Sequence, residues 1–150
     1  MTEFTEIIFK SFETLTPFEL YKILQLRNEV FVVEQNCVFQ DADNKDLTSM
    51  HLLMMQEEVL VAYCRLLPPG LAYTEMSIGR IVNSPKARGT GVGKILVAKA
   101  IELCSMQFGK GPIRIGAQYY LVGFYQSFGF KQEGDIYLED GIEHIEMVLG

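Results

Sequence analysis

The sequence predicts a single α/β (α+β) domain in which helices flank one mixed central sheet. Its 150 residues suffice for one hydrophobic core and not for two, so we assign residues 1–150 to one domain. Apolar residues make up 49% of the chain and charged residues 21%, which is the composition of a globular protein. Segments with strand periodicity precede, separate and follow segments with helical periodicity, and no repeat or linker interrupts them.

The first two elements are a strand and a helix. Residues 6–12 alternate weakly between polar and apolar side chains and predict a strand. Thr16, Pro17 and Glu19 then supply an N-cap, a proline at the first helical position and a capping-box acid, so a helix begins there. The apolar stripe expected along this helix comprises Leu20, Ile23, Leu24 and Phe31.

Arg27 falls on this apolar stripe, where another apolar side chain would be expected. Two interpretations remain open: an ion pair with Glu34 or another nearby acid, or a place in the wall of a cleft. Residues 34–51 are polar and acidic without a regular period, so we expect a loop with an acidic lining. Its aspartates do not match the EF-hand, which needs glycine and glutamate at set positions, so no metal site is predicted.

Strands and helices alternate through the rest of the chain. Two strands joined at Glu57 and Glu58 form a hairpin, which a Pro-Pro-Gly sequence ends. A further strand leads into a glycine-rich loop and a long helix, and the last two strands turn near Asp140 and Gly141. The predicted ranges are 51–56 and 59–67 for the hairpin, 76–82 for the next strand, 91–108 for the long helix, 113–117 for a strand, 121–128 for a short helix and 136–149 for the closing pair. The side chains expected to be buried along the long helix are Leu96, Ala100, Leu103 and Cys104.

Charge, hydropathy and cysteine content exclude several classes of function. The net charge of −6 and the isoelectric point near 4.9 leave no basic face for a phosphate backbone, so we expect no nucleic-acid partner. The N-terminus is acidic where a secretory signal would be basic, and no apolar run approaches the ~20 residues that cross a bilayer. We therefore expect a cytoplasmic protein with no membrane segment. The three cysteines form no CxxC pair, which predicts buried free thiols.

The stretch ARGTGVGK, residues 87–94, has the composition of a phosphate-binding loop. A nucleoside-triphosphate loop would need a glycine in place of Arg88 and a hydroxyl in place of Ile95, and a dinucleotide loop would need a third glycine where a lysine stands. The spacing that fits is R-x-x-G-x-G, formed with Gly91 and Gly93 between a strand and a helix. Glycines let the N–H groups at a helix start face a pyrophosphate, although a tight turn without ligand would also use them.

Two motifs in the same order mark a family resemblance. The run IGRIVNSPKARGTGVGK, followed after a helix and a strand by FYQSFGF, resembles the GCN5-related N-acetyltransferase (GNAT) superfamily, whose signature loop is [Q/R]-x-x-G-x-[G/A]. The runs LRNEVFVVEQNCVFQDAD and YLEDGIEHIEM resemble the ElaA-like branch of that superfamily, so the resemblance covers nearly the whole chain. The order of strands and helices expected above is also the order of that fold.

The resemblance implies an acetyl-coenzyme A (acetyl-CoA) site. Its pyrophosphate is expected on the loop, and its pantetheine arm along the preceding strand as an added strand would lie. Tyr125 stands at the usual general-acid position, although its spacing alone would suit a packed core aromatic. Gln118 replaces an asparagine that many relatives carry, which weakens its expected contact to the coenzyme. The residues expected to bind the coenzyme are Ile81, Val82, Asn83, Arg88, Gly89, Thr90, Gly91, Val92, Gly93, Gln118 and Tyr125.

The general base and the acceptor site are expected on the loop after the first helix, which lines the acceptor side in this superfamily. Glu34 is the expected base, with Asp43, His51 and His144 as further candidates and Arg27 as a cleft residue. Each has a structural alternative, such as an ion pair for Glu34 or a strand position for either histidine. Acids at the mouth would favour a cationic acceptor.

The function expected is therefore acetyl transfer from acetyl-CoA to the primary amine of a small molecule. Two alternatives remain open: an acyl-CoA sensor without transferase activity, and an acetyltransferase acting on protein lysines or N-termini. A homodimer that pairs the apolar C-terminal strands is also compatible with the sequence.

Overall fold

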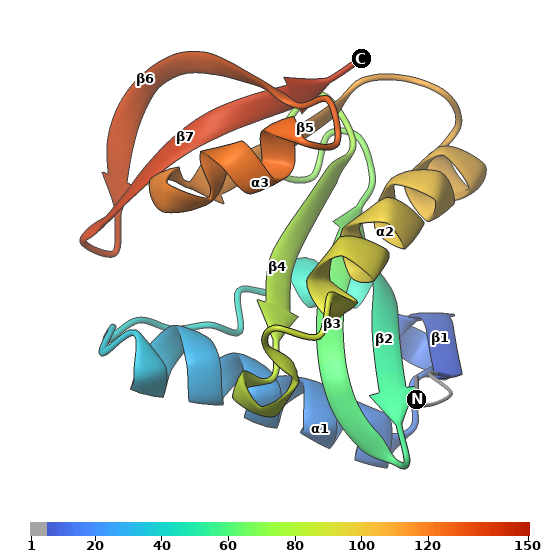
Figure 1. Cartoon of the computed structure of the whole chain (residues 1–150). Coiled ribbons are helices and arrows are strands. Elements are labelled where there is room, and N and C mark those ends of the chain that lie inside the picture. The colour runs from blue at the N-terminus through green and yellow to red at the C-terminus, as the bar shows by residue number, and fades with distance from the viewer. Residues whose placement is uncertain (1–5) are drawn as a thin grey trace.

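The computed structural model describes residues 6–150; residues 1–5, on which the prediction of no signal sequence partly rests, lie outside the described residues. The elements follow in the predicted order (Figure 1). The strands are β1 (Glu6–Ser11), β2 (Met50–Gln56), β3 (Val59–Leu67), β4 (Ser77–Asn83), β5 (Ile113–Gln118), β6 (Lys131–Glu139) and β7 (Ile142–Leu149), and the α-helices are α1 (Pro17–Arg27), α2 (Val92–Phe108) and α3 (Val122–Gln126). None of the helices in residues 6–150 has the length and hydropathy needed to cross a membrane.

The strands form two antiparallel sheets rather than one mixed sheet. One sheet has the order β1-β2-β3-β4 and the other the order β5-β7-β6. They meet at a parallel bridge between Met76 and Ile113, and the Arg114 N–H donates to the Met76 carbonyl at 3.0 Å. Beyond this point β4 and β5 do not pair within the described residues, so the sheet expected as continuous opens between them (Figure 1). This opening positions the candidate site.

The first helix begins as its sequence predicts. The Thr16 side chain accepts from the Glu19 N–H and Glu19 accepts from the Thr16 N–H, which completes the capping box. The α-helix ends at Arg27, and residues Asn28–Glu34 continue as a π-helical segment (η2). This change of period alters the predicted stripe, because Leu24 is exposed and the buried positions are Ile23, Leu26, Arg27 and Val30.

The first sheet separates two hydrophobic clusters. Alternate residues of β2 point to opposite faces, so Leu52 and Met54 pack with α2 while Leu53 and Met55 pack with α1. Figure 1 shows the two helices on either side of this sheet. Burial on both faces explains why β2 and β3 read as continuous apolar runs rather than as alternating ones. The predicted stripe of α2 is buried at Leu96, Ala100 and Cys104, and partly buried at Leu103.

Both predicted hairpin turns form with left-handed residues. Glu57 and Glu58 have φ of 51° and 66°, and Asp140 and Gly141 have φ of 52° and 79°. Positive φ at both central residues gives the turn the twist of its flanking strands. The last hairpin is longer than predicted, because β6 begins at residue 131 rather than 136. The early part of β6 is exposed and contains an irregular register between Glu133 and Tyr137, so it lacks the alternation that marks a strand.

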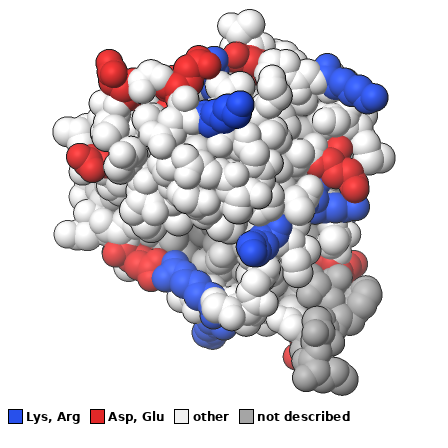
Figure 2. All heavy atoms as spheres, turned by 45° about the horizontal axis from the view of Figure 1, so that its top comes forward, with Lys and Arg blue, Asp and Glu red and all other residues white. Residues whose placement is uncertain are grey.

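Charge and thiols are distributed as the composition suggests. The face in Figure 2 carries isolated Lys and Arg side chains mixed with acids and a large uncharged centre, and it offers no continuous basic patch to a phosphate backbone. The cysteines Cys37, Cys64 and Cys104 are free thiols and all three are buried, as predicted.

Candidate active site

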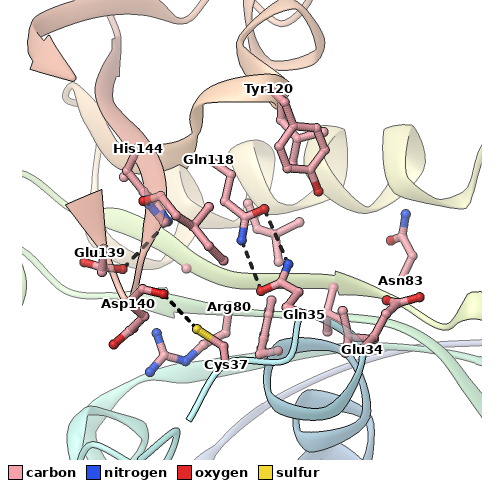
Figure 3. Close-up of a pocket in the computed structure, with 18 of the residues that line it drawn as sticks. Glu34, Gln35, Cys37, Arg80, Asn83, Gln118, Tyr120, Glu139, Asp140 and His144 are labelled. Atoms are coloured by element: carbon pink, nitrogen blue, oxygen red, sulfur yellow. Dashed lines mark hydrogen bonds and ion pairs between the residues drawn. The ribbon is translucent and has the colours of Figure 1, made fainter. Parts of the chain in front are cut away.

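A cavity of about 930 Å³ lies between the two sheets, where β4 and β5 stop pairing. β4 forms one wall, with every residue from Ile78 to Asn83 exposed to the cavity. The end of β5, helix α3 and the β6–β7 turn form the opposite wall, and the end of η2 crosses between them (Figure 3). Of the residues predicted to bind substrate or coenzyme, the lining contains Glu34, Asp43, Ile81, Val82, Asn83, Arg88, Gly93, Gln118, Tyr125 and His144.

The glycine-rich loop lies at the start of α2, and its residues Arg88 and Gly93 line one end of this cavity. Gly89 and Gly91 both have φ of 82°, a conformation that suits glycine, and Gly91 is the N-cap of α2. Gly93 allows a close approach to β4, because a Cβ at this position would lie 2.7 Å from Asn83 Nδ2. The N–H groups of the first helical turn have no acceptor within the helix and suit an anion. The loop residues Gly89, Thr90, Gly91 and Val92 themselves lie outside the cavity wall.

Asn83 has a buried polar atom without a partner. Its Oδ1 accepts no hydrogen bond within the described residues, although the side chain lies in the cavity wall. A buried carbonyl oxygen without a donor is unfavourable by about 1–3 kcal/mol, a cost that a ligand N–H group reaching it would remove. The pantetheine arm of coenzyme A carries such amide groups, and Asn83 is one of the residues predicted to contact it.

Glu34 lies in the cavity wall at the end that Asn83 occupies (Figure 3). Its carboxylate accepts two hydrogen bonds from Arg88, at 2.6 and 2.5 Å, so the two side chains form a bidentate ion pair. Hydrogen bonding by Arg88 lowers the pKa of Glu34. A carboxylate held in this way is a weak base. Glu34 is also not the partner of Arg27, which the sequence had left open. The geometry therefore does not support the expected role of Glu34 as the general base.

Tyr125 faces the cavity from α3 and is otherwise packed among aromatic side chains. Its ring contacts Phe124 and Phe130 edge-on, with centroids 5.2 and 6.2 Å away. Only 5% of the residue is exposed, and burial raises its pKa, so the phenol stays protonated at neutral pH. Within residues 6–150 its hydroxyl has no hydrogen-bond partner. The structure is therefore compatible with Tyr125 both as a packed core aromatic and as a general acid, because its ring is packed and the residue lines the cavity.

Aspartates of the predicted acidic loop are neutralised by arginines. Asp43 accepts from Arg65 through both oxygens at 2.7 Å, and Arg80 lies 3.4 Å from one of them. Hydrogen bonds from Arg65 lower the pKa of Asp43 well below its usual range, although burial opposes the shift. Arg80 also donates to one carboxylate oxygen of Asp41 at 2.8 Å and to the Asp41 backbone carbonyl at 3.0 Å. Three aspartates meet three arginines here, so the cluster adds no net charge that would attract a cationic acceptor.

Arg27 and His51 lie outside the cavity wall, which corrects their assignment to the acceptor site. The Arg27 guanidinium is buried and donates to Asp41 at 2.7 Å and to Asp46 at 2.8 Å. His51 is also buried, with its ring nitrogens 2.7 Å from the Tyr63 hydroxyl and 2.9 Å from the Asp46 carbonyl. The structural interpretation of each residue is therefore the supported one, since neither side chain can reach a ligand in the cavity.

Residues 34–37 connect the two walls across the middle of the cavity. The Gln35 and Gln118 side-chain amides each donate an N–H to the other's oxygen, with both Nε2–Oε1 distances at 3.4 Å. Cys37 Sγ donates to the Asp140 carbonyl at 2.9 Å (Figure 3). Sequence reasoning did not single out Gln35 or Cys37 as site residues. A π-helix has no recognisable sequence pattern, so nothing in the sequence indicated which side chains at its end would face the cavity.

His144 lies in the wall at the opposite end from the glycine loop, on β7 next to Gln118 of β5. Its Nδ1 is 2.8 Å from the Ile142 carbonyl, and its Nε2 is 3.8 Å from Glu139 Oε2. The Tyr137 ring stacks on the imidazole at a centroid distance of 5.7 Å. Figure 3 shows His144, Glu139, Asp140 and Arg80 around this end of the cavity. The sequence predicted only His144 and Asp43 here; Arg80, Glu139 and Asp140 lie in runs that resemble the family, but the resemblance implied no role for them.

The fold and the site together define a class of protein. A family model described as an acetyltransferase (GNAT) domain matches residues 25–150, and the chain therefore belongs to the GNAT acetyltransferase family. The glycine loop, Tyr125 and the opening between β4 and β5 are all within this matched region. The expected fold class and family are thus confirmed.

Particular relatives place the chain in the ElaA-like branch. It is 46% identical over 131 residues to protein ElaA of Escherichia coli strain K12, an alignment that covers 86% of each chain. The crystal structure of Escherichia coli ElaA is similar with a TM-score of 0.92 and 41% identity, covering 98% of this chain and 100% of that one. An acyl-CoA N-acyltransferase from Pseudomonas aeruginosa is similar with a TM-score of 0.93 and 39% identity, covering 97% and 99%.

Proposed function

We propose that the protein transfers the acetyl group of acetyl-CoA to the primary amine of a small molecule. The observation on which this rests is that one cavity is lined both by Arg88 and Gly93 of the R-x-x-G-x-G loop and by Tyr125 of α3. Membership of an acyl-CoA-using family supports the donor class, and acetyl-CoA and the amine acceptor are our proposal. The buried free cysteines suit the reducing cytoplasm, where we place the reaction.

The residues at the loop end of the cavity fit the coenzyme. Arg88 and the first N–H groups of α2 would hold the pyrophosphate, and the free Oδ1 of Asn83 would accept from a pantetheine amide. The backbone of Ile81 and Val82 would pair with the pantetheine as an added strand, because β4 has no strand beside it at this edge within the described residues. Acetyl-CoA supplies an activated acyl group on a thiol leaving group.

The remaining chemistry is proton transfer by the chain's own residues. An alkyl ammonium with a pKa of about 10.4 is nearly all charged at neutral pH, so the acceptor must lose a proton before it can attack. The departing sulfur must gain one, and Tyr125 is suited to donate it because burial keeps the phenol protonated. An acid and a base at different places in one cavity would meet both needs.

The contacts of residues 34–37 favour a small-molecule acceptor over a protein substrate. Gln35 and Cys37 bond to the opposite wall and bridge the cavity, so a peptide backbone could enter only if these contacts broke. A small amine needs no such opening. An acyl-CoA sensor would not need a protonated phenol in the cavity, and Tyr125 therefore favours transfer over sensing.

The test of this function is thiol release from acetyl-CoA in the presence of amines. The panel comprises polyamines, amino sugars, amino acids, aminoglycosides and lysine peptides, each compared with a reaction that contains no acceptor. We expect release above background with a small amine, and mass spectrometry should show an acetylated product. Tight acetyl-CoA binding by calorimetry with no release for any amine would contradict transferase activity and favour a sensor.

Glu34 is expected to compete with the coenzyme for Arg88. Glu34→Gln removes one partner of the ion pair and leaves Arg88 free for the pyrophosphate, so acetyl-CoA should bind about twofold to fivefold more tightly, the range for an exposed ion pair. Calorimetry measures this dissociation constant directly. Glu13→Gln is the matched control, because Glu13 is an exposed glutamate of the short 3-10 helix before α1 and does not line the cavity. Equal affinities for the two variants would show that Glu34 does not compete.

A further inference from the structure

We propose that His144 is the general base that takes the proton from the acceptor ammonium. This inference rests on the proposed acetyl transfer and names the residue that completes it. His144 is the ionisable side chain at the end of the cavity away from the glycine loop whose ring is both fixed in place and free to accept a proton. Figure 3 shows it on β7, beside Gln118 and facing Glu139.

Two contacts fix the imidazole and its tautomer. The Ile142 carbonyl is 2.8 Å from Nδ1, and since a carbonyl can only accept, Nδ1 carries the hydrogen and donates it. Nε2 is then the nitrogen with a lone pair. The Tyr137 ring stacks on one side with an interplanar angle of 26°, and only 7% of the residue is exposed, so the ring has little freedom to turn. The Nε2 lone pair is therefore held in a fixed direction.

The surroundings of Nε2 suit an incoming cation. Glu139 Oε2 lies 3.8 Å from Nε2, which is too long for a hydrogen bond and leaves room for an ammonium group to donate to both atoms. The ionisable groups at this end of the cavity are Tyr137 and Glu139 on β6, Asp140 in the turn and Arg80 on β4, whose guanidinium is paired with Asp41, whereas Gln118 on β5 is uncharged. After proton transfer, the negative charge of Glu139 would stabilise the imidazolium.

The carboxylates that the sequence favoured as bases are already bonded to arginines. Glu34 is paired with Arg88, and Asp43 is paired with Arg65 through both oxygens. Protonating Asp43 would break charge-assisted hydrogen bonds, so it is a poor acceptor of a proton, and Glu34 lies at the loop end of the cavity, away from His144. Histidine, in contrast, commonly changes its charge near neutral pH and is the side chain most often used as a general base.

The protons and bonds of the reaction balance with these two residues. The acceptor nitrogen gives up two protons overall. The first passes to His144 Nε2 and then to solvent. The second leaves after the nitrogen has attacked and passes through solvent to the Tyr125 oxygen, which has given its own proton to the departing sulfur. The nitrogen–carbon bond forms as the carbon–sulfur bond breaks. The net products are an acetamide, free coenzyme A and one proton, and no oxidant, reductant or metal is required.

Kinetics of His144→Gln test the role, with the panel amine that gives the fastest thiol release as substrate. We expect kcat/KM for the amine to fall about 100-fold, within the range for general-base catalysis, and the dependence of kcat/KM on the protonation of the base to disappear. The acetyl-CoA dissociation constant should stay unchanged. Glu143→Gln is the matched control, because Glu143 precedes His144 on β7 but lies outside the cavity wall. Added imidazole should restore part of the activity of His144→Ala.

A second measurement needs no substrate. Nitrogen-15 NMR of the imidazole should show hydrogen on Nδ1 and none on Nε2 at high pH, with His51 as the only other histidine signal. The opposite tautomer, or an unchanged pH profile in His144→Gln, would overturn the assignment while leaving acetyl transfer intact. A wild-type protein that binds acetyl-CoA but releases no thiol with any amine would instead contradict the proposed function.

Discussion

Replacing Tyr125 with phenylalanine is expected to lower kcat about 100-fold with little change in acetyl-CoA affinity. The substitution removes only the hydroxyl, so the edge-on packing against Phe124 and Phe130 is kept while the proposed proton donor to the departing sulfur is lost. A 100-fold loss corresponds to about 2.7 kcal/mol of transition-state stabilisation. Steady-state kinetics of thiol release and calorimetry with acetyl-CoA measure the two quantities.

Tyr119→Phe provides the control for this prediction. Tyr119 lies in the turn before α3, outside the cavity wall, so the loss of its hydroxyl should leave kcat unchanged. Circular dichroism checks that both variants are folded. A kcat for Tyr125→Phe within about threefold of the wild-type value would reject Tyr125 as the general acid and leave it as a core aromatic.

Asp46→Ala is expected to lower the free energy of unfolding by about 3–5 kcal/mol, the range for breaking a buried ion pair. One oxygen of Asp46 accepts from both Arg27 and Arg65, each at 2.8 Å, and both guanidinium groups are at least 95% buried. Without this carboxylate, Arg27 keeps Asp41 and Arg65 keeps Asp43, but each guanidinium loses its most buried partner. Urea denaturation followed by circular dichroism measures the change.

Two further variants make this prediction decisive. Asp135→Ala removes an exposed aspartate of β6 and should change the free energy of unfolding by less than about 0.5 kcal/mol. Asp46→Asn keeps one acceptor oxygen at nearly the same volume and should fall between Asp46→Ala and the wild type, which gives a measurable variant if alanine prevents folding. A loss below about 1 kcal/mol for Asp46→Ala would show that the cluster contributes little to stability.

The glycine-rich loop was predictable because its conformation depends on local sequence. A helix start that binds an anion needs glycines at set spacings, and Arg88, Gly91 and Gly93 follow one another within six residues. The capping box at Thr16 and the turn at Glu57 and Glu58 were predictable for the same reason, since each is formed by neighbours in the chain.

The acceptor end was less predictable because its charges come from segments far apart in the chain. The sequence shows that residues 34–51 are acidic, but it does not show that arginines from α1, β3 and β4 neutralise Asp41, Asp43 and Asp46. Expecting a cationic acceptor from these aspartates was therefore unsupported. The ion pair of Glu34 could not be read from the sequence for a related reason, because the π-helical turn brings it to Arg88, 54 residues later.

The sequence by itself determined the order of the elements, the helix caps, the tight turns, the free thiols and the family, because periodicity, capping and motif spacing act over a few residues. Only the tertiary structure decided where the sheet opens, which carboxylates are held by arginines, and which histidine borders the cavity. Those features depend on long-range packing and on the balance of burial against charge pairing. His51 and His144 show the difference: both lie on strands, yet one is locked against Asp46 and Tyr63 and the other faces the cavity.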